Sequence, residues 1–244
     1  MEKRFEVTAG DLSKRFYAAA AVIETDNAFA IALDGKPART RMRAPLAAAT
    51  RALAEAIAEE WRVQGEKIDF GAMPMTRYQM TVIDRAGQDA SMWRGVTLSF
   101  LATDLLCYRA AAPDELVRRQ SAGWDPLLQW AASEGVRLNV GQGAGFIAQP
   151  PDALSTGAAL LGRAPDPAQL AIKEAAEIAG SAVIALALWR RVFTAEALFE
   201  ASRVDETFQA EKWGSDREAE TRARRMKSDF LNAARYLSLT AAFG

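Results

Sequence analysis

The spacing of hydrophobic residues changes near residue 46, and this change limits the fold more than any other feature of the chain. Residues 29–33 alternate large apolar side chains with alanine, which is the period of a strand with one buried face. Asp34-Gly35 follows, and such a pair between strand-like runs is a strong hairpin signal. Residues 36–40 are therefore predicted to form the returning strand.

Helical spacing begins at Leu46 and continues, with interruptions, almost to the end of the chain. The apolar residues of 46–61 share one helix face, and we expect Gly65 to end this helix in a left-handed conformation. Further helices are predicted at residues 76–84, 89–103, 113–135, 170–191 and 216–239. Within one of them, Pro126 predicts a kink or a restart capped by Asp125.

These patterns predict an α+β protein with a small β-rich N-terminal domain and a larger all-helical C-terminal domain. We expect the domains at residues 1–84 and 85–244, and the first domain could recruit strands from later in the chain. Residues 138–167, which contain glycine, proline and serine, form the most loop-like region. Residues 178–189 are the most apolar, but a membrane span needs roughly 20 such residues, so we interpret this run as a buried helix.

The composition narrows the possible functions. The chain of 244 residues has no histidine and one cysteine, Cys107, which removes the commonest general base, the commonest metal ligand and any internal disulfide. The 30 basic and 31 acidic residues give a net charge of −1, unlike the basic excess of most nucleic-acid-binding domains. We therefore expect no catalysis, no cofactor, no metal, no nucleic acid, no membrane insertion and no small-molecule substrate.

Two weak signals point towards enzymes. Gly141, Gly143 and Gly145 form a GxGxG string, but Pro150-Pro151 follow where a dinucleotide site needs the start of a helix, so a turn is the better interpretation. A hydrolase with two catalytic carboxylates needs no histidine and stays open as an alternative function. Its candidate acids are Asp104, Asp125, Glu206 and Glu211.

Residues 205–216 gather acidic and aromatic side chains between two predicted helices. A helix end at Gly214, followed by a cap at Ser215 or Asp216, explains part of this segment. Aromatic residues bordered by acids are also typical of a partner-binding patch, and both interpretations stay open. The candidate partner-binding residues of this segment are Glu206, Phe208, Glu211, Trp213 and Asp216.

The stretch 124–130 offers a similar choice. It begins with Trp124 and Asp125 and ends with a second tryptophan about two helical turns later. Tryptophans at this spacing usually belong to the core, but they could also line the floor of an apolar groove. Trp124 and Asp125 are therefore further candidates for partner binding.

Many short strings resemble, in order, those of the assembly chaperone that binds the alpha subunit of the F-type ATP synthase. The strings are Arg15-Phe16-Tyr17, Leu33-Asp34-Gly35-Lys36-Pro37, Glu60-Trp61, Gln64-Gly65-Glu66, Met73-Pro74-Met75-Thr76-Arg77, Ile83-Asp84, Thr103-Asp104-Leu105-Leu106-Cys107-Tyr108-Arg109-Ala110, Arg119-Gln120, Trp124-Asp125-Pro126-Leu127-Leu128, Asp205-Glu206, Phe208-Gln209, Glu211, Trp213-Gly214 and Asp216. Together they span nearly the whole chain, although residues 141–167 match poorly.

The resemblance implies a non-catalytic chaperone with a β-containing N-terminal domain and a helical C-terminal domain. It implies binding of unassembled alpha subunit, which shields a surface that later faces the beta subunit. It also implies a functional acid near the C-terminus, for which Glu211 or Glu206 is the match. A bacterial cytoplasmic location is expected, with the mitochondrial matrix for eukaryotic relatives. A general scaffold that binds partner helices without client preference is the remaining alternative.

Overall fold

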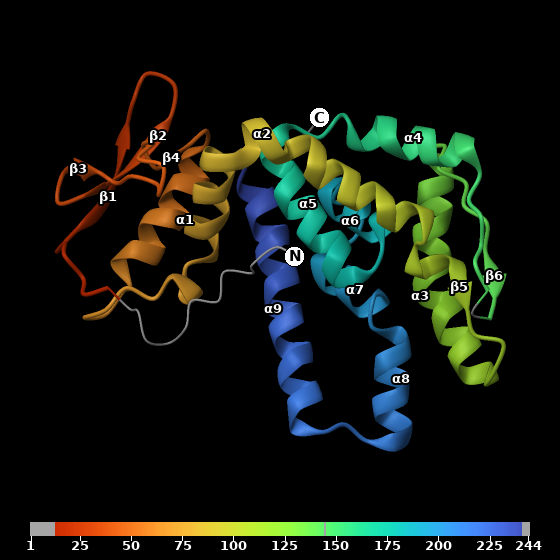
Figure 1. Ribbon diagram of the computed structural model, residues 1–244. Helices are drawn as coiled ribbons and strands as arrows, with labels where there is room; N and C mark the ends of the chain where they lie inside the picture. The colour runs from red at the N-terminus through yellow and green to blue at the C-terminus, as the bar shows by residue number, and fades with distance from the viewer. Residues whose placement is uncertain (1–12, 144, 241–244) are drawn as a thin grey trace. The chain divides into compact units, whose positions relative to one another are not determined.

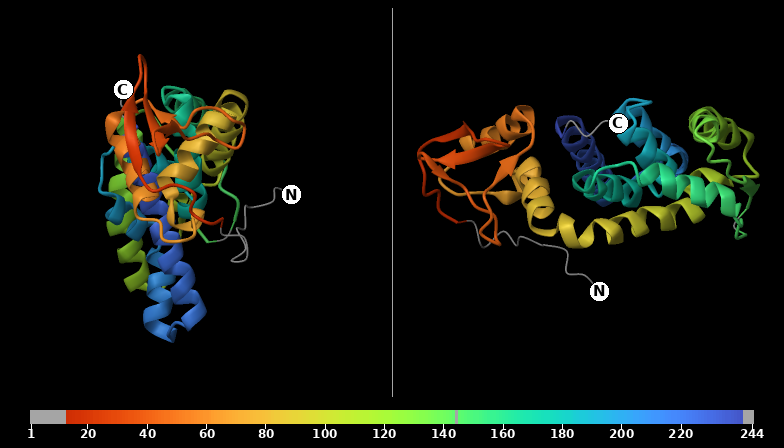
Figure 2. Two further views of the ribbon diagram at one scale, coloured as in Figure 1. Left: turned by 90° about the vertical axis from the view of Figure 1, so that its left-hand side faces the viewer. Right: turned by 90° about the horizontal axis from the view of Figure 1, so that it is seen from above.

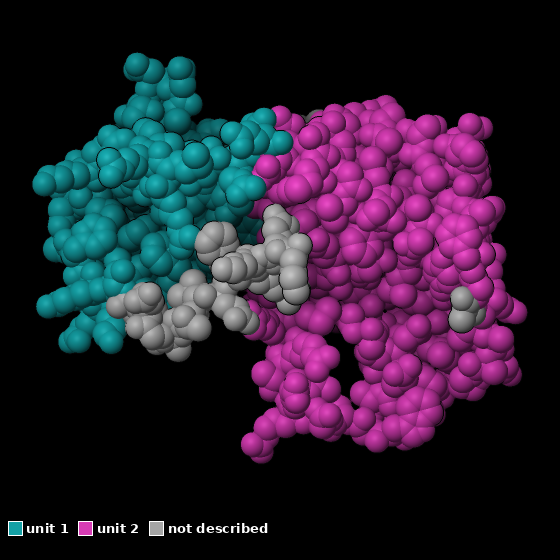
Figure 3. Space-filling model, in the orientation of Figure 1, with its two compact units in different colours: residues 1–88, 238–241 teal, residues 89–237, 242–244 magenta. Residues whose placement is uncertain are grey.

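The computed structural model describes residues 13–143 and 145–240, which mix a small sheet with many helices (Figure 1). It divides into two compact units, unit 1 with residues 1–88 and 238–241, and unit 2 with 89–237 and 242–244 (Figure 3). The predicted α+β class is confirmed, with the sheet in the N-terminal region and helices after it. The predicted domain limits of 1–84 and 85–244 stay a prediction.

The sheet of unit 1 is antiparallel and centred on β2. Its strands are β1 (Ala20–Glu24), β2 (Phe29–Leu33), β3 (Lys36–Pro37) and β4 (Ala47–Ala48). β2 pairs with each of the other three, and Leu33 lies opposite Lys36 across the predicted hairpin turn. Asp34 and Gly35 both have positive φ, 49° and 75°, as the favoured two-residue hairpin turn requires.

Helix α1 (Arg51–Arg62) packs against β1 and β2 and buries Leu53, Ile57 and Trp61. The prediction that Gly65 ends it was wrong, because the helix ends at Arg62 and Gly65 is not left-handed. The segment that follows the helix is held by the side chain of Gln64 instead. The Gln64 side chain donates to the carbonyl of Glu60 and accepts from the amide of Asp69, so it satisfies the backbone that the helix end exposes.

The 3₁₀ turn η1 (Phe70–Ala72) leads into α2 (Pro74–Ala102), a single helix where the sequence predicted two. Buried Glu60 fixes its start, because its two carboxylate oxygens accept from the backbone amides of Met75 and Thr76 at 2.8 and 2.7 Å. Gly87 lies where we predicted a break. A glycine inside a helix costs only about 1 kcal/mol, which a long packed helix tolerates.

The described residues of unit 2 are helical apart from one short parallel pair of strands. Its further elements are η2 (Leu105–Cys107), β5 (Tyr108–Arg109), α3 (Asp114–Ser133), β6 (Gly141–Gln142), α4 (Pro151–Leu161), α5 (Asp166–Ala179), α6 (Ala182–Trp189), α7 (Ala195–Ala201), α8 (Val204–Trp213) and α9 (Arg217–Leu239). β5 pairs with β6, and neither joins the sheet of unit 1. Among the described residues, no helix combines the length and the apolar character needed to cross a membrane.

Two predictions in unit 2 were wrong in detail. The expected loop region contains all of α4, whose first residue, Pro151, is a proline at a position where helices accept one. The expected helix over 170–191 divides at Gly180, which has φ 67°, and at Ser181, whose hydroxyl accepts from the amide of Ile184. All eight residues of α6 are buried, as expected for the apolar run.

Helix α3 continues through Pro126 without the predicted restart. Proline removes one helical hydrogen bond, which would have bound the carbonyl of Ala122. Both Pro126 and Ala122 are exposed, so water can reach the freed carbonyl. Asp125 is not a cap here, because its side chain instead accepts from Arg109 at 2.7 Å.

Candidate protein-interaction surface

The candidate residues of 205–216 lie on α8, except Asp216 in the turn after it, and α8 packs along α3 in unit 2. Phe208 is the anchor of this contact and is only 3% exposed. The guanidinium of Arg119 on α3 and the ammonium of Lys212 on α8 lie 5.4 and 5.3 Å from the centre of its ring. These distances allow cation–π attraction on top of the hydrophobic burial.

Ion pairs continue the contact from Phe208 towards the surface. Glu211 of α8 lies 2.7 Å from Arg119, and Arg119 lies 2.7 Å from Glu115 one turn earlier on α3. Glu115 also accepts from Lys212 at 2.9 Å. All four side chains are between 36% and 48% exposed, so each pair adds at most about 1 kcal/mol of stability. Their main effect is to hold alternating charges in a fixed order.

The charges perturb one another in the expected directions. Hydrogen bonds from Lys212 and then Arg119 lower the pKa of the Glu115 carboxyl below its usual value. The hydrogen bond to Glu211, together with the one to Glu115, raises the pKa of Arg119 despite its partial desolvation. The contacts therefore favour the charged forms of Glu115 and Arg119, which offer a partner fixed charges.

Beyond these pairs, α8 and α9 form a helical hairpin that projects from the rest of unit 2 (Figures 1 and 2). Gly214, with φ 83°, ends α8, and the Asp216 carboxylate accepts from the amide of Ala219 to cap α9. The predicted end at Gly214 and cap at Asp216 are thus confirmed. Trp213 stands at this turn with 77% of its surface exposed, so the helix end does not account for it.

A second network, made of hydrogen bonds, connects the start of α8 to the N-terminal half of α3. The Gln120 side chain, 1% exposed, donates to Asp205 at 2.7 Å and accepts from the backbone amide of Ala110 at 2.8 Å. Glu206, one residue further, forms an ion pair with Arg203, the residue that precedes α8. The start of α8 is therefore held by polar contacts, and its end by the charges around Phe208.

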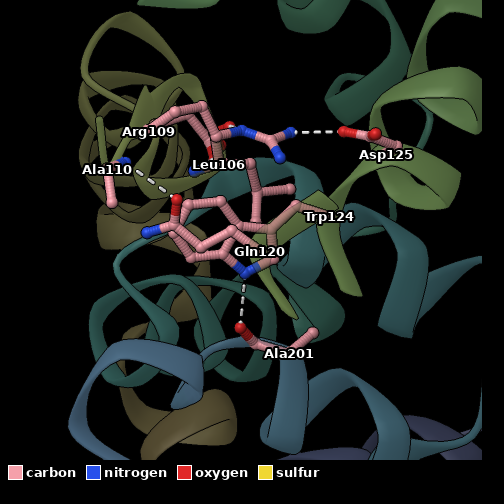
Figure 4. A network of polar contacts seen from close by, with 8 residues as sticks. Leu106, Arg109, Ala110, Gln120, Trp124, Asp125 and Ala201 are labelled. Carbon is pink, nitrogen blue, oxygen red and sulfur yellow. Dashed lines mark hydrogen bonds and ion pairs between the residues drawn. The ribbon is translucent and has the colours of Figure 1, made fainter. Parts of the chain in front are cut away.

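Figure 4 shows how Trp124 and Asp125 take part in this region. Trp124 is fully buried, and its indole N–H donates to the carbonyl of Ala201 at 2.7 Å. The guanidinium of Arg109 lies over its ring at 5.0 Å, donates to Asp125 at 2.7 Å and to the carbonyl of Leu106 at 3.0 Å. Trp124 therefore belongs to the hydrophobic core, and its ring packs against the Arg109 guanidinium that pairs with Asp125.

A pocket of about 390 Å³ opens next to this network. It is lined by Arg109, Val117, Gln120, Ser121, Val140, Gly141 and Gln142. Its polar groups are largely occupied already, because Arg109 is paired with Asp125 and Gln120 with Asp205. Gly141 lines the pocket as part of β6, and Gly143 lies in the turn after this strand, so the two glycines do not form a nucleotide-binding loop before a helix.

The acids of the hydrolase alternative have separate partners. Asp104 is fully buried and accepts from the backbone amides of Leu106 and Val183. Asp125 pairs with Arg109, Glu206 with Arg203, and Glu211 with Arg119. Within the described part of the chain, no three potential metal ligands form a group. These contacts give each acid a structural role.

The structure therefore sorts the seven candidate residues. Glu206, Glu211, Trp213, Asp216 and Asp125 keep accessible surface, whereas Phe208 and Trp124 are buried and cannot contact a partner directly in this conformation. The cations that organise the surface, Arg119 and Lys212, were not predicted. The four-residue spacing of Glu115 and Arg119 was the available signal, but such pairs occur on many helices.

Comparison with known proteins agrees with this architecture. The sequence model of the family described as "ATP12 chaperone protein" matches residues 14–132. The crystal structure of Atp12 from Paracoccus denitrificans is 37% identical, covers 93% of this chain and 98% of that one, and superimposes with a TM-score of 0.88. An aspartate-to-lysine variant of the Paracoccus protein, 36% identical, matches over the same shares with the same TM-score.

A candidate chaperone from Agrobacterium tumefaciens is also 37% identical. The match covers 93% of this chain and 86% of the Agrobacterium chain, with a TM-score of 0.88. Identity at this level over nearly the whole length, with the same fold, confirms the resemblance of the ordered sequence strings. The chain therefore belongs to the ATP12 chaperone family, whose members act in ATP synthase assembly.

Proposed function

We propose that this protein binds the unassembled alpha subunit of the F-type ATP synthase and shields the surface that will later face the beta subunit. Unassembled interfaces expose apolar patches that aggregate. A chaperone that covers such a patch stabilises the subunit by mass action, without fuel, and yields it to a partner that binds more tightly. The chain acts as a binding protein in this proposal, in the cytoplasm of a bacterium like those of its relatives.

The observation that carries the proposal is the exposed end of the α8–α9 hairpin. Trp213 is 77% exposed and directly follows Glu211 and Lys212, which form ion pairs with Arg119 and Glu115 of α3. Tryptophan is the residue type most enriched among interface hot spots, and a border of charges fixes the orientation of a partner. The buried Phe208 contributes by keeping α8 against α3, which holds this surface in place.

The test is selective binding by purified proteins. Alpha and beta subunits from the same organism are mixed separately with the chaperone, and binding is measured by size-exclusion chromatography and calorimetry. We expect a complex with alpha only, and release of the chaperone when beta is added. Equal binding to alpha, beta and an unrelated aggregating client would refute client selectivity and favour a general scaffold.

A matched pair of variants locates the surface. Trp213→Ala and Phe146→Ala each remove an aromatic side chain that is 77% exposed, so both should leave stability within about 0.5 kcal/mol of the parent. Only Trp213→Ala should weaken alpha binding, by roughly 2 kcal/mol or about 30-fold if it is a hot spot. Equal losses in both variants would contradict the assignment to the hairpin.

A further inference from the structure

A short hairpin between β3 and β4 gathers positive charge in unit 1. Residues 35–54 contain no acid. Four cations within them are exposed, namely Lys36, Arg39, Arg41 and Arg43. These four belong to the 30 basic residues that nearly balance 31 acids in the whole chain, so the remaining residues carry a clearly negative net charge. Positive charge is therefore concentrated in this segment, and we call residues 36–46 the cationic hairpin.

Backbone bonds give the cationic hairpin a defined shape. Arg39 and Pro45 form an antiparallel bridge, and the amide of Thr40 donates to the carbonyl of Ala44 at 2.9 Å. The amide of Arg43 donates to the carbonyl of Thr40 at 3.0 Å and closes the turn. The arginines therefore project from a fixed backbone, so a partner that binds them does not have to order a loose loop.

Two acids lie at this segment, and both are already engaged. Asp84 of α2 accepts from the hydroxyl of Thr40 at 2.5 Å and from the amide of Met42 at 3.4 Å, which attaches the hairpin to the helix. Asp34, in the turn before Lys36, accepts from two backbone amides of the segment that precedes β1. Four cations against two bound carboxylates leave an excess of positive charge at the surface.

Arg43 occupies a backbone conformation that its side chain disfavours. Its φ of 65° lies in the left-handed region, which glycine and asparagine adopt far more readily than a long side chain does. The last residue of a three-residue hairpin loop is commonly left-handed, and glycine suits it best. An exposed residue kept against the local preference points to a role outside the fold. The position therefore favours a function for the arginine itself.

The tip of the hairpin combines cations with an apolar side chain. Met42, which is 67% exposed, stands between Arg41 and Arg43 in the sequence. Arginine binds carboxylates through two parallel N–H···O bonds, and methionine adapts its shape to different apolar partners. A membrane surface or a nucleic acid extends beyond the hairpin and would also meet the acidic remainder of the chain, which it repels. The chemistry therefore fits a short acidic segment of a protein.

We infer that the cationic hairpin is a second docking site, which binds a short acidic segment of the client with an apolar side chain between its carboxylates. The carboxylates pair with Arg39 and Arg43, and the apolar side chain packs on Met42. This site belongs to unit 1, whereas the surface around Trp213 belongs to unit 2. Two sites on one chain strengthen binding, because the first contact raises the effective concentration for the second. The identity of the client rests on the proposed function.

Charge removal tests the inference with a matched control. The double variant R39Q/R43Q removes two positive charges from the hairpin, and R137Q/R163Q removes two exposed arginines of unit 2. None of the four arginines forms an ion pair with a described residue. We expect R39Q/R43Q to weaken alpha-subunit binding by on the order of tenfold and to reduce its salt dependence.

The control R137Q/R163Q should stay within about threefold of the parent, because long-range charge effects are small at physiological salt. Circular dichroism and the melting temperature first check that both variants fold like the parent. If the parent binds alpha and the two variants bind it equally well, the inference is wrong and the proposed function stands.

Single replacements of Arg43 separate binding from folding. Arg43→Asn removes the charge and suits the left-handed backbone, so it should raise the melting temperature and weaken alpha binding by roughly threefold. Arg43→Lys keeps both the charge and the disfavoured conformation, so both measurements should stay close to those of the parent. An Arg43→Asn variant that is more stable and binds alpha as tightly as the parent would contradict a binding role for the arginine.

Synthetic peptides test the site without the alpha subunit. Three peptides of equal length are titrated by NMR: the first has aspartates on both sides of a central leucine, the second has asparagines in place of the aspartates, and the third has serine in place of the leucine. We expect the parent to bind the first peptide best and R39Q/R43Q to lose this preference, even if the parent fails to bind alpha.

Three results would overturn the inference. Equal binding of the three peptides would mean that the hairpin is an ordinary solvated surface. Binding to phosphatidylglycerol vesicles that depends on Arg39 and Arg43, without any preference among the peptides, would assign the hairpin to a membrane surface. Self-association that R39Q/R43Q abolishes would assign it to a second copy of the chain.

Discussion

Asp104 connects two distant parts of unit 2, and replacing it with asparagine is the most informative stability test. One carboxylate oxygen accepts from the amide of Leu106 at 3.1 Å, and the other accepts from the amide of Val183 at 3.0 Å, at the start of α6. Asparagine keeps the shape but has one acceptor. Its NH₂ group would face one of these N–H donors, and a buried donor left without an acceptor costs about 1–3 kcal/mol.

The pH dependence tests the same argument more sharply. Burial raises the pKa of Asp104 to about 6, against the lowering effect of its hydrogen bonds from Val183, Ser181, Leu106 and Ala182. A carboxyl whose pKa is higher in the folded than in the unfolded protein binds its proton more tightly when folded. Its contribution to stability is therefore complete below the ordinary value near 3.8, and disappears as pH rises through about 6.

The expected size follows from the two pKa values. For pKa values of about 6 and 3.8, the parent gains about 1.3 kcal/mol from this group between pH 7 and pH 5. The Asp104→Asn variant cannot gain it. The difference in unfolding free energy between parent and variant should therefore widen by that amount as pH falls, while contributions from all other acids cancel.

Urea unfolding followed by tryptophan fluorescence at pH 7, 6 and 5 measures this difference. Asp152→Asn, an exposed acid in the first turn of α4, serves as the control and should cost less than about 1 kcal/mol at pH 7. A parent-to-variant difference that stays flat or narrows as pH falls would refute the reasoning. It would mean that the amide donors and the dipole of α6 outweigh desolvation and keep the carboxylate charged.

Three further perturbations test the packing of unit 2. Trp124→Phe removes the indole donor and leaves a buried carbonyl unsatisfied, so urea unfolding should show a loss of about 1–3 kcal/mol; a loss under about 0.5 kcal/mol would contradict the buried bond. Gly157→Ala places a Cβ 2.3 Å from a methyl carbon of buried Leu101 and should lower the melting temperature through overpacking. Gly95→Ala, in open space on α2, should raise the melting temperature by adding helix propensity. A shift in the same direction for both glycine variants would refute the clash at Gly157. Cys107 is buried, and desolvation raises the pKa of its thiol to about 12, so Ellman's reagent should label it only at the rate of unfolding; fast labelling of the folded protein would contradict its burial.

Local sequence rules succeeded at several turns and helix ends where a residue acts on its own neighbours. The Asp34-Gly35 hairpin turn follows from the left-handed backbone that a tight turn requires. The end of α8 at Gly214 and the cap of α9 at Asp216 follow from the same kind of short-range bonding. The burial of α6 could also be predicted, because its eight residues have no polar side to present to water.

Predictions failed where a side chain outside the usual capping positions satisfies the backbone at a helix end. Glu60 determines where α2 begins through bonds to amides 15 and 16 residues later. Gln64 replaces the expected glycine ending of α1 with side-chain bonds to the backbone on both sides. Rules based on periodicity and capping do not consider these hydrogen-bond partners. They therefore predicted a different helix boundary in each case.

The sequence by itself determined the mixed fold, the lack of histidine chemistry and, through its ordered strings, the chaperone resemblance. Only the tertiary structure decided which members of the aromatic and acidic segment remain available to a partner. Phe208 and Trp213 look alike in sequence, yet the first is buried beneath Arg119 and the second is exposed. The physical reason is that accessibility depends on which distant helix covers a side chain, and α3 covers the side of α8 that carries Phe208 but leaves Trp213 exposed.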